Sequence, residues 1–288
     1  MTLPHADVKA FFHADTGSVQ YVVRDPASTA AAIIDPVLDF EPRSAATATT
    51  AADELADHVR DQGLEVAWVL DTHPHADHFS AVPYLAEMFH APSAIGEHVV
   101  QVQRLWRDLY NLPDFPADGS QWDRLFAAGD TFDVGNLRGR VMHSPGHTLA
   151  SVTYVIGDAA FVHDSLFMPD FGSARADFPG GDAGDLYRSI QSLLALPDDM
   201  RLFTGHDYKP GGREPRWETT VGEQKASNIH FRDNPDEAAF VAMREARDRE
   251  LPLPRLMLAA LQVNIRGGRL PAPESNDTAY LKIPLNRF

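Results

Sequence analysis

The sequence predicts a mixed α/β domain in which two β-sheets are sandwiched between helices. Short apolar runs bounded by turn residues are typical of strands, and they recur in the first third of the chain and again over 131–204. Stretches with helical spacing separate and follow them. This order differs from the regular strand–helix alternation of a doubly wound sheet. With 288 residues, of which 44% are hydrophobic, the chain can bury a sizeable core.

The first third predicts strands followed by a helix. Three strands are expected at 8–12, 18–23 and 31–34. A helix is expected over 50–62, where Leu55 and Val59 are one turn apart and Gly63 follows as a stop. The next run, 66–70, is almost continuously apolar, which favours a strand buried on both faces.

The remainder predicts further helices and a second group of strands. We expect Ser80 to cap a helix that ends near Met88, with Pro83 in its first turn. Further helices are expected at 97–110 and 182–196, a surface loop at 111–120, and strands at 131–134, 138–143, 151–156, 159–163 and 201–204. Gly157 and Asp158 are expected to form a tight hairpin turn.

Charge and composition exclude several classes of protein. The net charge of −16 repels phosphate backbones, so we expect no nucleic-acid partner. The chain contains no cysteine, which excludes disulfides, thiolate ligands and a cysteine nucleophile. No run approaches the roughly 18 apolar residues of a membrane span, and no secretory signal is visible. We therefore expect a cytoplasmic protein that does not bind membranes.

A cluster of potential metal ligands begins where the 66–70 strand ends. His73, His75, Asp77 and His78 fall within six residues. Two histidines at positions i and i+2 of an extended loop project to the same side, and we expect Asp77 and His78 at the start of the next helix. Imidazoles with a carboxylate suit Zn²⁺ or Fe²⁺. The segment therefore predicts a metal centre.

Three later residues offer ligands at the ends of other predicted strands. His147 follows the strand that ends at His143, Asp164 follows 159–163, and His206 follows 201–204. A single histidine at a strand end is more often structural than a ligand. Together with the first motif, however, the three indicate one site at the edge of the sheets.

This set resembles the metallo-β-lactamase superfamily, whose seven ligand positions are all filled here by the HxHxDH motif at 73–78, His147, Asp164 and His206. The resemblance covers at least 8–208 and implies the αβ/βα sandwich, with two mixed sheets flanked by helices. It implies one domain over 1–288, with an insertion at about 97–123 and a C-terminal extension at about 231–288. The insertion either walls the pocket or forms a subunit contact, or it is a hydrated surface segment. The scaffold hosts hydrolases, nucleases and oxidoreductases, so it does not fix the reaction.

Within the superfamily, the chain resembles the persulfide dioxygenase (sulfur dioxygenase) branch, which is related to glyoxalase II. The segment 170–178 has that branch's Gly-x-x-Arg-x-Asp-Phe-like character, and 205–208 looks like its His-Asp-Tyr motif. The separation of His147 and Asp164 is short, at 17 residues (164 − 147). The segments 262–271 and 280–286 look like the C-terminus of the bacterial β-lactamase-like hydrolase proteins.

The resemblance implies a non-haem Fe²⁺ enzyme, with one iron per chain, that oxidises glutathione persulfide with O₂ to sulfite and glutathione. Its implied iron ligands are His73, His147 and Asp164. The other four residues of the set would orient ligands and substrate: His75, Asp77, His78 and His206. A homodimer is expected, because dimers are common in this family.

Two alternatives remain open. In a glyoxalase II-like thioester (or lactone) hydrolase, the same four residues would bind a second metal ion, with two Zn²⁺ per chain. A non-catalytic binding module would be expected to have lost ligands, and none is lost here.

Substrate-binding residues are expected in two segments. Arg175 is placed near the substrate by the resemblance, and Tyr208 belongs to the His-Asp-Tyr motif. Glutathione carries two carboxylates, and Lys209 and Arg213 form a local basic patch that suits them. The alternative interpretation of this patch is a solvated basic loop.

Overall fold

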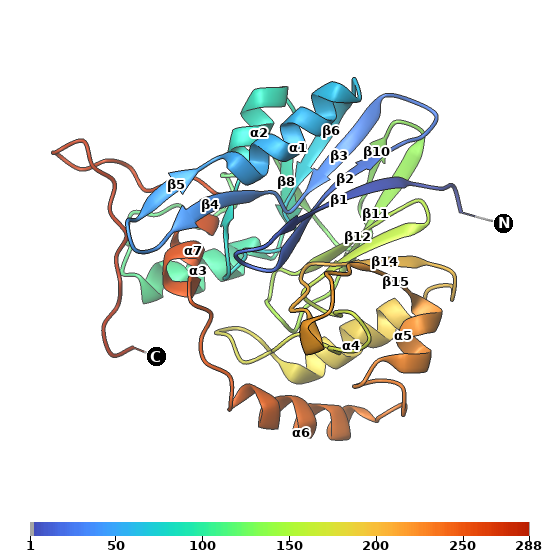
Figure 1. Cartoon of the computed structure of the whole chain (residues 1–288). Coiled ribbons are helices and arrows are strands. Elements are labelled where there is room, and N and C mark those ends of the chain that lie inside the picture. The colour runs from blue at the N-terminus through green and yellow to red at the C-terminus, as the bar shows by residue number, and fades with distance from the viewer. Residues whose placement is uncertain (1–2, 288) are drawn as a thin grey trace.

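The computed structural model describes residues 3–287 and contains two six-stranded mixed sheets packed face to face, with helices on both outer sides (Figure 1). A small three-stranded sheet lies beside them. The predicted sandwich is confirmed. Most predicted elements occur, with ends shifted by one or two residues. The predicted turn at Gly157 is also present, and its φ is +58°.

The first sheet places the metal-ligand loop at one of its edges. Its strand order is β1 (Asp7–His13), β2 (Ser18–Arg24), β3 (Ala30–Ile34), β6 (Glu65–Leu70), β8 (Ser93–Gly96) and β9 (Arg124–Phe126). The first three strands pair antiparallel, and β3, β6, β8 and β9 pair parallel. Because β3 and β6 are parallel, Asp35 and Asp71 emerge side by side at their carboxyl ends. The β6 strand is fully buried only at Val69 and Leu70, so the expectation of burial along its whole length was wrong.

The second sheet brings three more ligand-bearing segments to the same edge. Its order is β10 (Thr131–Val134), β11 (Leu137–His143), β12 (Val152–Ile156), β13 (Ala159–His163), β14 (Arg201–Thr204) and β15 (Glu218–Thr220). All pairs are antiparallel except β13–β14, whose carboxyl ends therefore lie together. The small sheet contains β5 (Ala46–Ala48), β4 (Val37–Glu41) and β7 (Phe79–Ser80).

The core between the sheets is aromatic. Phe161 stacks on Phe203 with ring centroids 5.2 Å apart, and Tyr21 packs edge-on against both. Buried tyrosines need hydrogen-bond partners. The Tyr21 hydroxyl donates to the Thr204 carbonyl at 2.5 Å, and the Tyr154 hydroxyl donates to the Asp71 carbonyl at 2.8 Å. Each of these bonds joins the two sheets close to the strand ends that carry the polar cluster.

Helices cover the two outer faces. On the first sheet pack α1 (Thr50–Asp61), α2 (Val82–Phe89), α3 (Val99–Leu109) and α7 (Met257–Asn264). On the second pack α4 (Ala183–Leu194), α5 (Val221–Ser227) and α6 (Glu237–Asp248), and a short 3₁₀ helix spans Pro210–Gly212. No helix in the described chain is long and apolar enough to cross a bilayer.

The helix after the metal-ligand loop starts later than expected. Its N-cap is Ala81, and Ser80 instead belongs to β7, where it pairs with Val37 of β4. The Ser80 hydroxyl donates to Asp71 Oδ1 at 2.8 Å and accepts a weaker bond from the Val82 N–H at 3.2 Å. Asp77 and His78 therefore lie in an irregular loop and not at a helix start.

The 97–123 segment packs closely on the molecule. Trp106, Tyr110 and Trp122 are buried in the core beneath α2 and α7. Gln103 is fully buried; its amide donates to the Gln121 side chain and the Ile265 carbonyl and accepts from the Gly119 N–H. This segment therefore packs against the helices of the first sheet and is hydrogen-bonded to the end of α7.

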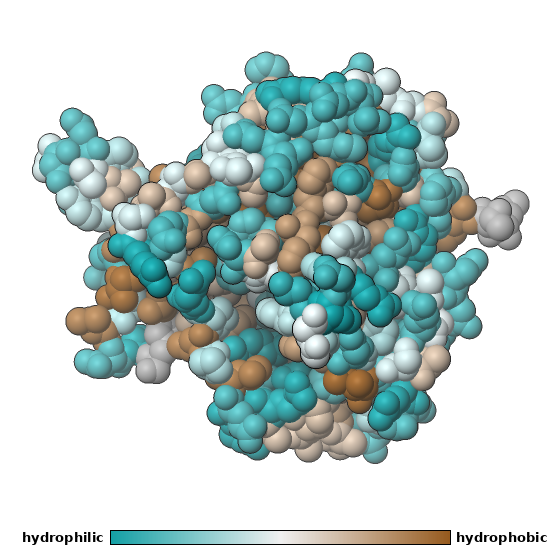
Figure 2. Space-filling model, in the orientation of Figure 1, coloured by the Kyte–Doolittle hydropathy of each residue, from teal (hydrophilic) through white to brown (hydrophobic). Residues whose placement is uncertain are grey.

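The C-terminal segment after α7 runs along one side of the molecule in extended form (Figure 1). Most of the face in Figure 2 is hydrophilic, and hydrophobic residues gather on the left, where this segment lies. It exposes Leu270, Tyr280, Ile283 and Leu285.

Candidate metal centre

All seven predicted ligand residues meet at the edge where the two sheets face each other. The first four lie in the loop after β6, His147 lies in the turn after β11, and Asp164 and His206 follow β13 and β14. Six of the seven are buried, and Asp77 is partly exposed. The expectation that these residues lie together is confirmed.

The ligand atoms form two groups. His73, His147 and Asp164 each offer one atom within 4.8 Å of the others, and so do His75, Asp77 and His78. Asp164 Oδ2 of the first group lies 3.6 Å from His147 Nε2 and 3.4 Å from Nε2 of His206, which belongs to neither group. His206 Nε2 is also 3.3 Å from Asp77 Oδ2.

The buried polar atoms here suit a metal ion. His73 Nε2, His75 Nδ1 and Asp164 Oδ1 are buried and have no hydrogen-bond partner in the described chain. Leaving such atoms unpaired is costly, and a bound cation satisfies them. Neutral imidazoles are required for this, and burial lowers the pKa of both His73 and His147. The residues therefore form a His/Asp metal-binding site.

Four of the histidines are oriented through the nitrogen opposite the one aimed at the centre. His73 Nδ1 forms a hydrogen bond with the Thr72 hydroxyl at 3.0 Å, and His147 Nδ1 forms one with the Arg175 carbonyl at 2.9 Å. His78 Nδ1 forms a hydrogen bond with the Phe79 carbonyl at 2.9 Å, and His75 Nε2 forms one with the Asp35 carboxylate at 3.0 Å. Partners of this kind set the tautomer and ring orientation of metal-binding histidines.

Asp35 is a functional candidate that the sequence analysis did not identify. Its carboxylate accepts bonds from the Thr72 N–H and hydroxyl, both at 2.7 Å, besides the bond to His75. Burial alone would raise the Asp35 pKa, but the charge and hydrogen bond of His75, together with the hydrogen bonds from Thr72, lower it overall. Burial opposes protonation of His75, but Asp35 raises the His75 pKa to about 9. A carboxylate at the end of the strand parallel to 66–70 is the signal that could have identified it.

Asp71 is a second buried carboxylate close to His75. A third set of close ligand atoms combines Asp35, Asp71 and His75. However, Asp71 already accepts bonds from the Ser80 hydroxyl and from Trp122 Nε1, at 2.8 and 3.2 Å. Burial raises the pKa of Asp71 to about 7. We therefore assign Asp35 and Asp71 to the support of the loop and not to metal binding.

Gly146 allows the His147 turn to reach the centre. Its φ is +127°, and a Cβ atom there would lie 2.2 Å from the Leu186 backbone nitrogen in α4. A larger residue would push the turn away from α4, and His147 would move with it.

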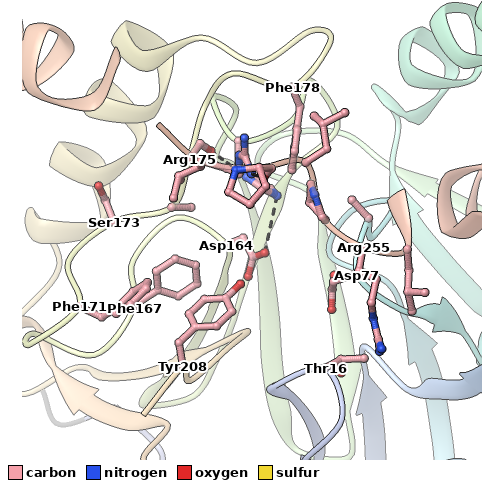
Figure 3. Close-up of a pocket in the computed structure, with 18 of the residues that line it drawn as sticks. Thr16, Asp77, Asp164, Phe167, Phe171, Ser173, Arg175, Phe178, Tyr208 and Arg255 are labelled. Atoms are coloured by element: carbon pink, nitrogen blue, oxygen red, sulfur yellow. Dashed lines mark hydrogen bonds and ion pairs between the residues drawn. The ribbon is translucent and has the colours of Figure 1, made fainter. Parts of the chain in front are cut away.

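A cavity of about 570 Å³ opens onto this centre. Asp77, His147 and Asp164 line its inner end. In Figure 3, Asp164 lies between Phe167, Phe171 and Tyr208 on one side and Asp77 and Arg255 on the other. The outer rim is formed by 251–256, the connection between α6 and α7. No residue of 97–123 is among the described residues that line this cavity.

Two of the four expected substrate residues line the cavity. Tyr208 does so with its ring stacked on His206, with centroids 5.4 Å apart. Arg175 also lines the cavity, but its guanidinium is paired with Asp177 at 2.7 and 2.8 Å and donates to the Pro252 carbonyl. Its charge is therefore compensated, and its side chain ties the cavity wall to the rim.

Lys209 and Arg213 do not line the cavity. Arg213 is held by Asp170 and Asp207, with closest contacts of 2.6 and 2.5 Å. Lys209 is exposed, and its Nζ lies 5.6 Å from the centre of the Phe12 ring. Arg213, one of the two residues of the basic patch expected after Tyr208, is therefore neutralised by Asp170, which is distant in sequence, and by Asp207, which lies six residues before it.

The free positive charge at the cavity comes from elsewhere. Arg247 and Arg255 are exposed and line the cavity, and the structure shows no ion pair for either with another described residue. Arg244, which also lines the cavity, is buried and paired with Asp248 at 2.6 Å. Arg244, Arg247 and Arg255 were not predicted from the sequence, because no motif distinguishes them from the other arginines of the helical C-terminal region.

The chain belongs to the metallo-beta-lactamase superfamily, whose family model matches residues 14–206. It is 65% identical to a beta-lactamase hydrolase-like protein from Xylella fastidiosa (strain Temecula1), over 97% of this chain and 64% of that protein. The chain thus spans slightly less than two thirds of that relative. It is 42% identical to glyoxylase B2 of Dictyostelium discoideum, over 98% of this chain and 97% of that protein. The crystal structure of ETHE1 from Myxococcus xanthus aligns with a TM-score of 0.73 and 28% identity, covering 91% of this chain and all of that one.

Replacing Asp35 with asparagine should weaken metal binding. The change removes the charge that orients His75 and that holds the Thr72 hydroxyl against His73. Loss of such a partner typically lowers metal affinity by about 10- to 100-fold. Competition with a chromophoric chelator measures the Kd directly.

Asp25→Asn is the matched control. Asp25 is a buried carboxylate that also accepts several hydrogen bonds, but it lies beyond the opposite end of β3. The control should lower the melting temperature without changing metal affinity. Wild-type affinity in folded Asp35→Asn would contradict the role assigned to Asp35.

Proposed function

We propose that the protein is a persulfide dioxygenase with one Fe²⁺ per chain, bound by His73, His147 and Asp164. The observation that carries this proposal is the compact buried group that these three residues form at the inner end of the cavity. Two histidines and one carboxylate are the ligand set of non-haem Fe²⁺ oxygenases, and this set leaves coordination positions for O₂ and substrate. The similarity to ETHE1 from Myxococcus xanthus supports the proposal.

The proposed reaction converts glutathione persulfide, O₂ and water to glutathione and sulfite. The outer sulfur atom loses four electrons and O₂ gains them, and the three sulfite oxygens come from O₂ and water. The sulfur–sulfur bond breaks, one proton goes to the glutathione thiol and two protons are released. Fe²⁺ held by His73, His147 and Asp164 would supply the redox chemistry.

The residues around the ligands orient the histidine rings and limit the access of water. The Thr72 hydroxyl and the Arg175 carbonyl fix the rings of His73 and His147. Phe167, Phe171 and Phe178 give the cavity an apolar wall that limits water around a reactive persulfide.

Arg247 and Arg255 are the proposed binding groups for the carboxylates of glutathione. Both stand at the cavity without an ion-pair partner in the described chain, unlike Arg175 and Arg213. A guanidinium is suited to a carboxylate through paired N–H donors. They supply the local positive charge that an anionic substrate needs on a chain with net charge −16.

A thioester (or lactone) hydrolase with two metal ions is the second candidate. It is favoured by the second ligand group, His75, Asp77 and His78, and by Asp164 Oδ2, which lies close to both His147 and His206. A carboxylate in that position suits a bridge between two metal ions. The similarity to glyoxylase B2 is compatible with this candidate.

Metal analysis of protein purified without oxygen separates the two functions. We expect one Fe per chain and O₂ uptake on addition of glutathione persulfide, with sulfite formed in equal amount. Two Zn per chain, cleavage of a glutathione thioester and no O₂ uptake would instead establish the hydrolase.

Removing the charge at the cavity rim should weaken substrate binding. Arg255→Ala should raise KM for glutathione persulfide about tenfold with a smaller change in kcat, because a charge-assisted hydrogen bond contributes about 1.5–3 kcal/mol. Steady-state O₂ uptake measures both constants.

Arg213→Ala is the control, since it removes an arginine of the same charge that is already paired with Asp170 and Asp207. It should lower the melting temperature and leave KM nearly unchanged. If Arg213→Ala raised KM and Arg255→Ala did not, the substrate carboxylates would bind at the basic residues after Tyr208 and not at the cavity rim.

A further inference from the structure

The metal-ligand loop, residues 73–78, lacks the hydrogen bonds that usually hold backbone in place. In the described chain, no backbone–backbone hydrogen bond involves any of these six residues. The flanking residues are fixed, since the Thr72 carbonyl accepts from the Val152 N–H and the Ala81 N–H donates to the Pro36 carbonyl. Buried backbone groups require partners, so something else must hold the ligand-bearing segment.

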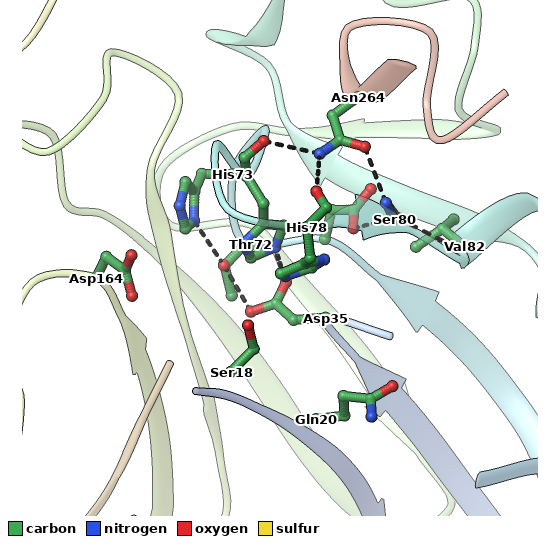
Figure 4. A network of polar contacts seen from close by, with 12 residues as sticks. Ser18, Gln20, Asp35, Thr72, His73, His78, Ser80, Val82, Asp164 and Asn264 are labelled. Atoms are coloured by element: carbon green, nitrogen blue, oxygen red, sulfur yellow. Dashed lines mark hydrogen bonds and ion pairs between the residues drawn. The ribbon is translucent and has the colours of Figure 1, made fainter. Parts of the chain in front are cut away.

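A single side chain from the C-terminal region supplies two of these partners. Asn264, the last residue of α7, is buried and uses its amide on this loop and on Ser80, which follows the loop (Figure 4). Its Nδ2 donates to the His75 and His78 carbonyls at 2.8 and 2.7 Å. Its Oδ1 accepts from the Ser80 N–H at 2.9 Å. Only an amide, with two donors and an acceptor, matches two carbonyls and one N–H in this way.

We propose that Asn264 is a positioning residue for the metal centre, and that α7 is thereby a functional part of it. The bonds from Asn264 fix the backbone at His75 and His78, on either side of Asp77. Asn264 therefore sets where the group formed by His75, Asp77 and His78 stands relative to His73, His147 and Asp164.

The backbone that follows α7 is built for this close approach. Gly268 has φ +81°, and a Cβ atom there would lie 2.3 Å from the Ser80 carbonyl oxygen and 2.8 Å from Pro83 Cδ. The Gly267 and Gly268 N–H groups donate to the Asn264 and Val263 carbonyls, which closes the end of α7. Buried Gln103 of α3 holds the same turn through the Ile265 carbonyl at 2.8 Å. Asn264 is thus presented to the loop by a fixed turn.

The influence of Asn264 is unequal across the centre. It contacts the residues of the second ligand group, whereas the rings of His73 and His147 are oriented by Thr72 and Arg175. Loss of Asn264 should therefore displace His75 and His78 more than the first group. This inference concerns the metal centre and holds for either reaction proposed above.

The test uses Co²⁺ as the probe, because its visible absorption reports ligand number and geometry. Asn264→Asp keeps the side-chain shape but places an oxygen against two carbonyl oxygens. We expect it to weaken Co²⁺ binding by the group formed by His75, Asp77 and His78 about 10- to 100-fold, to weaken binding by the first group less, and to alter the visible spectrum of the loaded protein. Asn264→Ala should show the same changes.

Asn228→Asp is the matched control. Asn228 is also a fully buried amide that donates to a backbone carbonyl, that of Gly172, and to the Gln224 side chain, but it contacts no residue of the metal-ligand loop. It should lower the melting temperature and leave both Co²⁺ affinity and spectrum unchanged. If both substitutions change stability alone, Asn264 is merely structural and the inference is overturned.

A second variant covers the case in which the Asn264 variants do not fold. Gly268→Ala removes no hydrogen bond but presses on Ser80, so it should change the Co²⁺ spectrum to a smaller degree. A wild-type spectrum for folded Gly268→Ala would then overturn the inference. If wild-type protein binds Co²⁺ but catalyses neither O₂ uptake nor thioester cleavage, the proposed function fails while this inference stands.

Discussion

The structure depends on supplying hydrogen-bond partners to a buried loop whose backbone forms no hydrogen bonds with other backbone in the described chain. The segment 73–78 presents four ligand residues from irregular backbone, and none of that backbone pairs with other backbone in the described chain. Side chains of distant elements hold it instead: Asp35 after β3 bonds to the His75 ring, and Asn264 at the end of α7 bonds to the His75 and His78 carbonyls. Tyr154 of the second sheet fixes the Asp71 carbonyl just before the loop. Through these contacts, the position of the ligands is a property of the whole fold.

The polar cluster is costly to the fold without a cation. Histidine nitrogens and a carboxylate oxygen are buried there without hydrogen-bond partners in the described chain. Unpaired buried polar atoms destabilise a protein by about 1–3 kcal/mol each. Metal binding removes this cost, so metal affinity and folding stability are coupled. The supports of the loop therefore serve both the fold and the site.

Features carried by local pattern were predictable from the sequence. The sandwich, most strands and helices and the meeting of all seven ligand residues follow from periodicity, turn residues and a compact motif. The strands β8 and β9 were missed because runs of four and three residues are too short to show a period. The start of α2 was misplaced because Ser80 pairs with β4 and bonds to Asp71, and neither contact is visible locally.

The outer parts of the site depended on contacts between segments far apart in sequence. Arg213 looked like a free charge until its partners, Asp170 and Asp207, were located. Arg255 stood in no motif, yet the connection from α6 to α7 carries it to the cavity rim. Asn264 lies in a segment that indicated only family resemblance, and its role arises from two bonds to the metal-ligand loop and one to Ser80, all more than 180 residues away in sequence. Charge and residue type suggested Arg213, whereas Arg255 and Asn264 are defined only by tertiary contacts.

The central claim is that the two ligand groups are unequal, with one Fe²⁺ held by His73, His147 and Asp164. Anomalous diffraction at the iron edge, from crystals grown and kept without oxygen, tests it most directly. We expect one strong peak among these three residues. Two peaks of equal height, the second among His75, Asp77 and His78, would contradict it.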